Sequence, residues 1–255
     1  MLEDTSVTDS AADRSNIANA PWTISDMVRA TLLSLLLMAL GGVVILGVGL
    51  VLRLAGLSID GQDAPITVAM TVVQNVSFAF AVWFFGLRKH SVGVERLGFR
   101  PFAAAAGCSY AAFAMLLAFG FNAFYSVISN RLDRPLETQP VLDYFGGGLF
   151  GFAVALTIAA GLVPFVEEMF FRGFLLPGLT RRFGLIAGII VSSALFGAAH
   201  MSPDTFLPLS FFGVVLALLY SATGSIYPGI VVHSINNSIA LLAAYMMELG
   251  LLSGL

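Results

Sequence analysis

The sequence places two carboxylates and one guanidinium inside an apolar stretch. Glu167, Glu168 and Arg172 interrupt a run of largely apolar residues that extends from 146 to 176. On insertion scales, one charged side chain at the centre of a membrane helix costs roughly 2.5–3.5 kcal/mol. Three such groups in one apolar run therefore require partners, water or a chemical role.

Helical spacing gives the three charged groups different tasks. Glu168 and Arg172 are four residues apart, so on a helix they share a face and can form an ion pair. Glu167 is rotated by about 100° from Glu168 and has no cation at this spacing. We therefore expect the Glu168–Arg172 pair to brace the site and Glu167 to be the reactive group. The alternative is an ion-pair cluster that only holds buried helices together.

Two histidines and an amide lie in other apolar stretches. His200 ends the run 191–200, His233 lies within the last apolar stretch, and Asn237 follows His233 by one helical turn. Each histidine by itself is more often a satisfied hydrogen bond between helices than a ligand. Glu167 and His200, however, each lie about 16 residues, or about 24 Å of helix, from a turn at 183–184. An antiparallel helix pair folded at that turn places them at one depth.

The last apolar stretch can bring its polar groups to the same level. His233 is about 13 Å along a helix from the turn at Gly224, and Asn237 shares its face. If the helix that carries Glu167 projects about 10 Å beyond the bilayer at its basic end, Glu167, His200 and His233 lie at similar depth. A buried carboxylate can act as a general base, and histidine can position water or bind a metal. A neutral amide can donate to an oxyanion, so this set predicts a hydrolase.

Composition predicts an all-α, polytopic transmembrane helical bundle. The chain has 255 residues, of which 58% are hydrophobic and 11% are charged, whereas a soluble domain has about 25% charged residues. Its mean hydropathy is +0.92. We expect about seven spans, with six to eight as the range, at 27–54, 66–87, 102–128, from 146 through the charged motif, 185–200, 206–221 and 226–249.

The sequence also predicts the domain organisation and the orientation in the membrane. Residues 1–25 are expected to form a disordered polar tail, and residues 26–255 a single transmembrane domain with the candidate motifs in 146–244. With seven crossings, nine Lys and Arg residues fall on the side of the amino terminus and three on the other side. This distribution predicts a cytoplasmic amino terminus in the plasma (inner) membrane. A net charge of −3 does not suggest nucleic acid as a partner.

Two further residues are expected to have ordinary roles. Cys108 is the only cysteine, so it cannot form an intramolecular disulfide, and we expect a small core residue there. His90 lies in a basic loop and is expected to be solvated.

Three motifs occur in a fixed order over residues 146–244. They are Glu167-Glu168-x-x-x-Arg172, then Phe196-x-x-x-His200, then His233-x-x-x-Asn237. In this order they resemble the motifs of the CPBP family, the CAAX protease and bacteriocin-processing or abortive-infection proteins. The chain is similar in particular to the type II CAAX prenyl endopeptidases.

The resemblance implies an all-helical intramembrane endopeptidase whose conical cavity opens to membrane and cytosol. It implies that Glu167 and His200 activate the attacking water and that His233 and Asn237 hold the oxyanion. The neighbouring ion pair would support the site. The implied partners are the lipid bilayer and a membrane-embedded or membrane-anchored protein or peptide substrate, prenylated or not.

The sequence leaves the cofactor and two other functions open. Glu167, His200 and His233 can form a His₂Glu set for one zinc or another divalent metal, with water as the fourth ligand, as in a metalloendopeptidase. The same residues can instead work with no metal, as base, water holder and oxyanion donor. The competing functions are a non-catalytic membrane immunity or scaffold protein and a small transporter.

Overall fold

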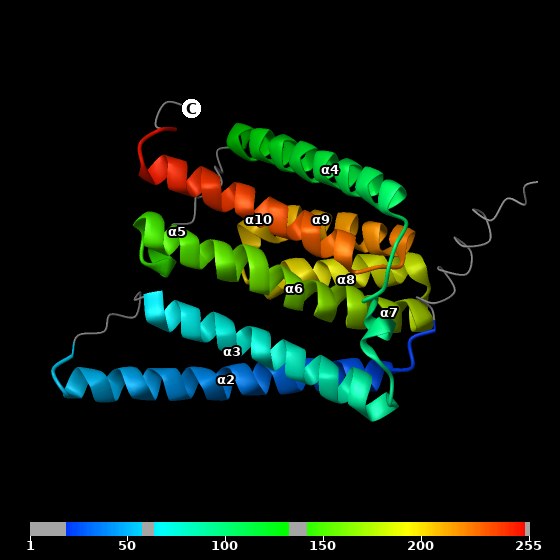
Figure 1. Cartoon of the computed structure of the whole chain (residues 1–255), viewed down its shortest axis with the longest axis horizontal. Helices are drawn as coiled ribbons and strands as arrows, with labels where there is room; N and C mark the ends of the chain where they lie inside the picture. The colour runs from blue at the N-terminus through cyan, green and yellow to red at the C-terminus, as the bar shows by residue number, and fades with distance from the viewer. Residues whose placement is uncertain (1–18, 58–63, 133–141, 253–255) are drawn as a thin grey trace, which may run out of the picture.

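The chain was analysed as a computed structural model, which describes residues 19–57, 64–132 and 142–252. These residues form a bundle of helices in which no strand occurs (Figure 1). Apart from the segment that carries Glu167, the long helices are α2 (Ile24–Leu54), α3 (Ala64–Val82), α4 (Ala104–Arg131), α9 (Pro203–Thr223) and α10 (Tyr227–Glu248). Short turns η1 (Trp83–Arg88), η2 (Val94–Leu97) and η3 (Asp143–Phe145) lie between them.

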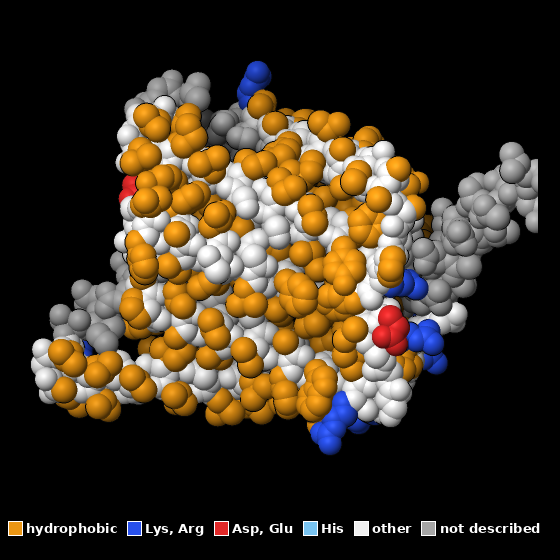
Figure 2. Space-filling view, viewed as in Figure 1, with side chains coloured by type: hydrophobic (Ala, Val, Ile, Leu, Met, Phe, Trp, Pro, Cys, Tyr) orange, Lys and Arg blue, Asp and Glu red, His pale blue; other side chains and the backbone are white. Residues whose placement is uncertain are grey.

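Among the residues that the structure describes, six helices are long and apolar enough to cross a membrane, and a further apolar helix, α8 (Leu185–Ala199), is shorter. The predicted all-α polytopic bundle is therefore confirmed, and the chain is an integral multi-pass membrane protein. The space-filling view shows hydrophobic side chains over the sides of the bundle (Figure 2). Most of the Lys and Arg side chains visible there lie at the end of the bundle where α2 begins.

The charged motif lies on one long helical segment, residues 148–183, in the middle of the view (Figure 1). It consists of α5 (Gly148–Thr157), η4 (Ile158–Leu162), α6 (Val163–Glu168), η5 (Met169–Leu175) and α7 (Leu176–Phe183), of which η4 and η5 are π-helical. Each π segment directly precedes a first turn that contains a proline, Pro164 or Pro177. Proline lacks the N–H donor and crowds the carbonyl one turn back. The wider π turns accommodate both prolines within one helix.

The residues just before α2 are ordered and pack against the motif helix. Trp22 is fully buried, and its Nε1 donates to the carbonyl of Phe174 at 2.8 Å. Thr23 caps α2 through a capping box with Asp26. The predicted tail boundary at residue 25 was therefore placed too late, because it falls inside the first helix; residues 1–18 lie outside the described residues.

Two smaller expectations were also wrong. Cys108 is exposed on α4 and is not a core residue. His90 is not freely solvated, because its Nε2 lies 3.1 Å from Oδ2 of Asp26, whose side chain is 1% exposed. Lys89 pairs with the same carboxylate. Side chains more than 60 positions apart make this cluster, so spacing along the chain did not indicate it.

Helices α8 and α9 form the hairpin that carries His200. The predicted turn is present at Gly184, whose φ of +84° suits glycine. A side chain at Gly197 would bring Cβ to 2.7 Å from the carbonyl oxygen of Phe206, and one at Gly213 to 3.0 Å from Cα of Ser193. These two glycines thus allow close packing of α8 on α9.

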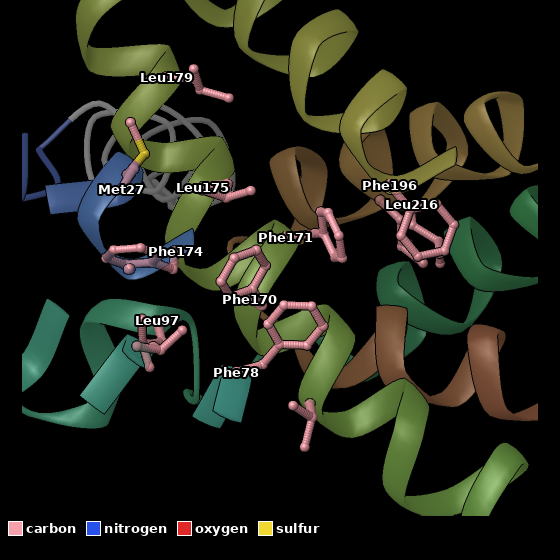
Figure 3. Packing of buried hydrophobic residues seen from close by; sticks show 14 of the residues in the cluster. Met27, Phe78, Leu97, Phe170, Phe171, Phe174, Leu175, Leu179, Phe196 and Leu216 are labelled. Carbon is pink, nitrogen blue, oxygen red and sulfur yellow. The ribbon is translucent and has the colours of Figure 1, made fainter. Parts of the chain in front are cut away.

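Aromatic packing fixes the motif helix against α3. The ring of Phe78 on α3 lies 4.5 Å from Phe170 and 6.5 Å from Phe171, centroid to centroid. Figure 3 shows these rings together, with Phe174 and Leu97 further along the same core. The two amino-terminal membrane helices therefore position the charged segment, although they carry none of the three motifs.

Candidate active site

The predicted ion pair is present and buried. Arg172 Nη1 donates to Glu168 Oε1 at 2.7 Å, and the two side chains are 2% and 1% exposed. Arg172 Nη2 also donates to the carbonyl of Gly213 on α9, at 3.2 Å. The guanidinium carbon lies 4.4 Å from the ring centroid of Phe196, a cation–π distance. Glu168 and Arg172 therefore join the motif helix to both α8 and α9.

His233 contacts both glutamates. Its Nδ1 lies 3.1 Å from Glu168 Oε1, and its Nε2 lies 3.8 Å from Glu167 Oε2. The imidazole is 3% exposed. A carboxylate that accepts from one ring nitrogen fixes the tautomer and the orientation of the ring. Glu168 therefore aims the second nitrogen of His233 at Glu167, a role that helical spacing did not reveal.

Glu167 has a buried oxygen without a hydrogen-bond partner among the described residues, and this oxygen faces the ring of His233. The residue is 6% exposed, and the oxygen is Oε2. Removing a buried acceptor from water without replacing its bond costs about 1–3 kcal/mol. This is the arrangement required of a base that takes a proton from a water molecule.

Gly229 is a site residue that the sequence analysis did not identify. A Cβ at this position would lie 2.9 Å from Glu168 Oε2, which is buried and has no hydrogen-bond partner among the described residues. Gly229 precedes His233 by one turn, so both face the motif helix. The four-residue spacing between Gly229 and His233 could have indicated this role in the sequence. Glycine is so frequent in membrane helices, however, that the spacing alone does not single out Gly229.

Asn237 lies one turn beyond His233 and connects α10 to η4. Its Nδ2 donates to the carbonyl of Ala159 at 2.8 Å. A primary amide has two N–H donors, so one remains for another acceptor. The π-helical segment η4 thus holds Asn237, the side chain that the resemblance predicts to bind the oxyanion.

His200 reaches this cluster only at its edge. It is exposed at the end of α8, with Nδ1 2.9 Å from the carbonyl of Phe196. Its ring packs edge-on against Phe196 at 5.0 Å, and Phe196 in turn lies 5.7 Å from the ring of His233. In the part of the chain that the structure describes, His200 forms no ion pair with Glu167. Phe196, given no role from the sequence, is the ring that both histidines contact.

The comparisons with known proteins address this same region. Residues 149–239 match the family model described as Type II CAAX prenyl endopeptidase Rce1-like. The resemblance to CAAX proteases is thereby confirmed over these residues. This Rce1-like region runs from α5 into α10 and contains every candidate site residue. The match supports an intramembrane hydrolase of peptide bonds in general. No curated protein and no solved structure matches the chain.

The possible metal set of the Rce1-like region was tested against the geometry. Within residues 19–57, 64–132 and 142–252, no three His, Cys, Asp or Glu side chains are grouped so that they could hold a metal ion. His200 is the member of the predicted set that lies apart from the other two. The described side chains therefore do not fit a three-ligand metal site, and the chemistry below is derived from the protein groups alone.

Proposed function

We propose that this protein is a CAAX-protease-like intramembrane endopeptidase that cleaves membrane-embedded or membrane-anchored substrates with water activated by Glu167. The observation that carries the proposal is the buried, unpartnered Oε2 of Glu167, which faces an imidazole that Glu168 orients. A membrane interior that excludes bulk water strengthens such electrostatic contacts. The Rce1-like match over residues 149–239 supports the same reaction class.

In the proposed first step, Glu167 removes a proton from a water molecule. The water oxygen forms a bond to the carbonyl carbon of the peptide, and the electron pair of the C=O bond moves to the carbonyl oxygen. The remaining N–H of Asn237 and a protonated Nε2 of His233 donate to this oxyanion. Glu168 supports that charge on His233 because it accepts from Nδ1 at 3.1 Å.

In the second step, the tetrahedral intermediate collapses. The oxyanion re-forms the C=O bond, the C–N bond breaks, and Glu167 passes its proton to the leaving amine. We propose that His200 contacts the water on the exposed side of the site, since its ring packs on the same Phe196 ring as His233. No metal is required at any of these steps.

For the orientation we propose a cytoplasmic amino terminus in the plasma membrane. Basic side chains that follow η1 and end α7 lie beside the start of α2, since Lys89 pairs with Asp26 and Arg181 donates to the carbonyl of Ala20. The space-filling view shows most of the visible Lys and Arg side chains at this end (Figure 2). Such an excess of positive charge is typical of the cytoplasmic side. Cleavage would then occur near that surface.

Replacement of the proposed base tests the function. Membranes that contain the wild-type protein are compared by quantitative proteomics with membranes that contain Glu167→Gln, which is isosteric but cannot take the proton. The control is Glu95→Gln, at an exposed glutamate on η2. We expect intact substrates to accumulate only in Glu167→Gln, at wild-type protein level. Identical peptide profiles in all three, or a biological effect that survives Glu167→Gln, would argue for a scaffold.

A purified assay complements the proteomics. The probe is a farnesylated CAAX-motif peptide with a fluorophore and a quencher on opposite sides of the cysteine, presented in micelles. We expect cleavage by the wild-type protein and a loss on the order of 10²–10⁴-fold in Glu167→Gln, the usual contribution of general acid–base catalysis. Equal rates for the two proteins would contradict the assignment of Glu167.

A further inference from the structure

Helix α3 carries a buried amide that none of the motifs includes. Asn75 is 2% exposed. Its Nδ2 donates to the carbonyl of Thr71 in the same helix at 2.8 Å. Its Oδ1 is buried and has no hydrogen-bond partner among the described residues. A native protein rarely leaves such an acceptor unpaired without a reason.

Asn75 faces the motif helix and not α2. It shares a helical face with Phe78, three residues later, and Val82, seven residues later, which are both buried. Phe78 contacts the rings of Phe170 and Phe171, as Figure 3 shows. The side of α3 that meets α2 is a different one, where the carbonyl of Ser77 accepts from that helix.

The register of the two helices brings Asn75 to the level of Glu167. Helices α3 and α5–α7 lie side by side and run in the same direction (Figure 1). Phe78 meets η5, and toward the other end Val68 packs against the cluster that contains Ala160 of η4. One turn before Phe78 on α3 is Asn75. One turn before its ring partners on the motif helix is Glu167, on the same face.

The two side chains offer complementary chemistry at this level. Glu167 Oε2 and Asn75 Oδ1 are both buried acceptors without a donor among the described residues. A water molecule carries two O–H donors and can satisfy both at once. A neutral amide suits the second position, because a second carboxylate there would oppose the charge on Glu167.

We propose that Asn75 is a further residue of the catalytic site, whose side-chain oxygen holds the water that Glu167 deprotonates. The inference rests on the proposed hydrolysis. One O–H of the water points at Glu167 and is lost to it, while the other points at Asn75. That second hydrogen stays on the oxygen and ends in the carboxylic acid product. With both O–H bonds held, a lone pair of the water is directed at the peptide carbonyl.

The kinetic test uses the farnesylated CAAX-motif peptide and the full-length protein. Asn75→Leu removes the acceptor at similar size, and Asn75→Gln keeps a neutral amide oxygen. Ser77→Ala is the matched control, since Ser77 is equally buried on α3 but its hydroxyl bonds within the helix. We expect Asn75→Leu to lower kcat about 10–100-fold with KM nearly unchanged, as loss of one oriented hydrogen bond implies. Asn75→Gln should retain several-fold more activity than Asn75→Leu, and Ser77→Ala should match the wild type.

The outcomes separate this inference from the proposed function. If the wild type cleaves and Glu167→Gln does not, but Asn75→Leu is as fast as Ser77→Ala, the endopeptidase stands and the role of Asn75 is overturned. An effect on KM alone, or equal losses in folded Asn75→Leu and Asn75→Gln, overturns it as well. Thermal unfolding of each variant shows which of them are folded.

A second measurement needs no substrate and no variant. An experimental structure of the wild-type protein that resolves ordered water should place one molecule within hydrogen-bond distance of both Asn75 Oδ1 and Glu167 Oε2. Finding the two oxygens too far apart to share one water refutes the proposal, whatever the kinetics of the variants.

Discussion

Removal of Arg172 should destabilise the protein more than any exposed charge does. Arg172→Met keeps much of the apolar stem but leaves Glu168, which is 0% exposed, without its cation. Breaking one side of a buried ion pair costs about 3–5 kcal/mol, because the remaining charge is uncompensated. The lost hydrogen bond to the carbonyl of Gly213 adds to that cost. For a protein of this size, the sum corresponds to a fall in Tm of about 6–20 °C.

The assay is thermal unfolding of purified protein in one detergent, followed by circular dichroism. The control is Arg182→Met, an exposed arginine at the end of α7, which should stay within about 0.5 kcal/mol of the wild type. A double variant, Glu168→Gln with Arg172→Met, removes both charges and should recover part of the loss. The explanation fails if the Tm of Arg172→Met is no lower than that of Arg182→Met. It also fails if the double variant loses more unfolding free energy than the two single variants lose together.

Three other predictions follow from close contacts in the site. Gly229→Ala should reduce cleavage of the farnesylated peptide about tenfold, since its Cβ would lie 2.9 Å from Glu168 Oε2. The control Gly120→Ala, with nothing within 4 Å of its Cβ, should leave the rate unchanged. Equal cleavage rates for the two variants would contradict this prediction. Trp22→Phe should lower unfolding stability by about 1–2 kcal/mol, because it removes the buried bond to Phe174; an unchanged Tm would show that the bond is not stabilising. Chelation should leave the cleavage rate of purified protein unchanged, and activity that is lost on chelation and restored by one zinc per chain would overturn the metal-free steps.

The sequence was sufficient for the class of fold and for one pair in the site. Apolar runs separated by turn residues determine membrane helices, because backbone groups in lipid must bond within their own segment. The four-residue spacing of Glu168 and Arg172 predicted their ion pair, because residues four apart lie on the same face of a helix. The turn at Gly184 was likewise a local property of the chain.

Contacts between distant segments were beyond this kind of reasoning. Neither residue types nor their spacing predicted the π-helical turns η4 and η5. The order of residues 19–25 depends on Trp22, whose bond partner is 152 positions away. Helical depth placed His200 level with Glu167, yet the end of α8 leaves its ring exposed against Phe196.

What the sequence determined by itself was the set of chemical groups and their approximate depth, because both follow from residue type and from the fixed rise of a helix. Only the tertiary structure decided which groups face each other. It brought His233 onto both glutamates, and it placed Asn75 on the face of α3 that carries Phe78 and packs against the motif helix. Rotation of one helix against another is set by side-chain packing across their interface, and no spacing within a single helix encodes it.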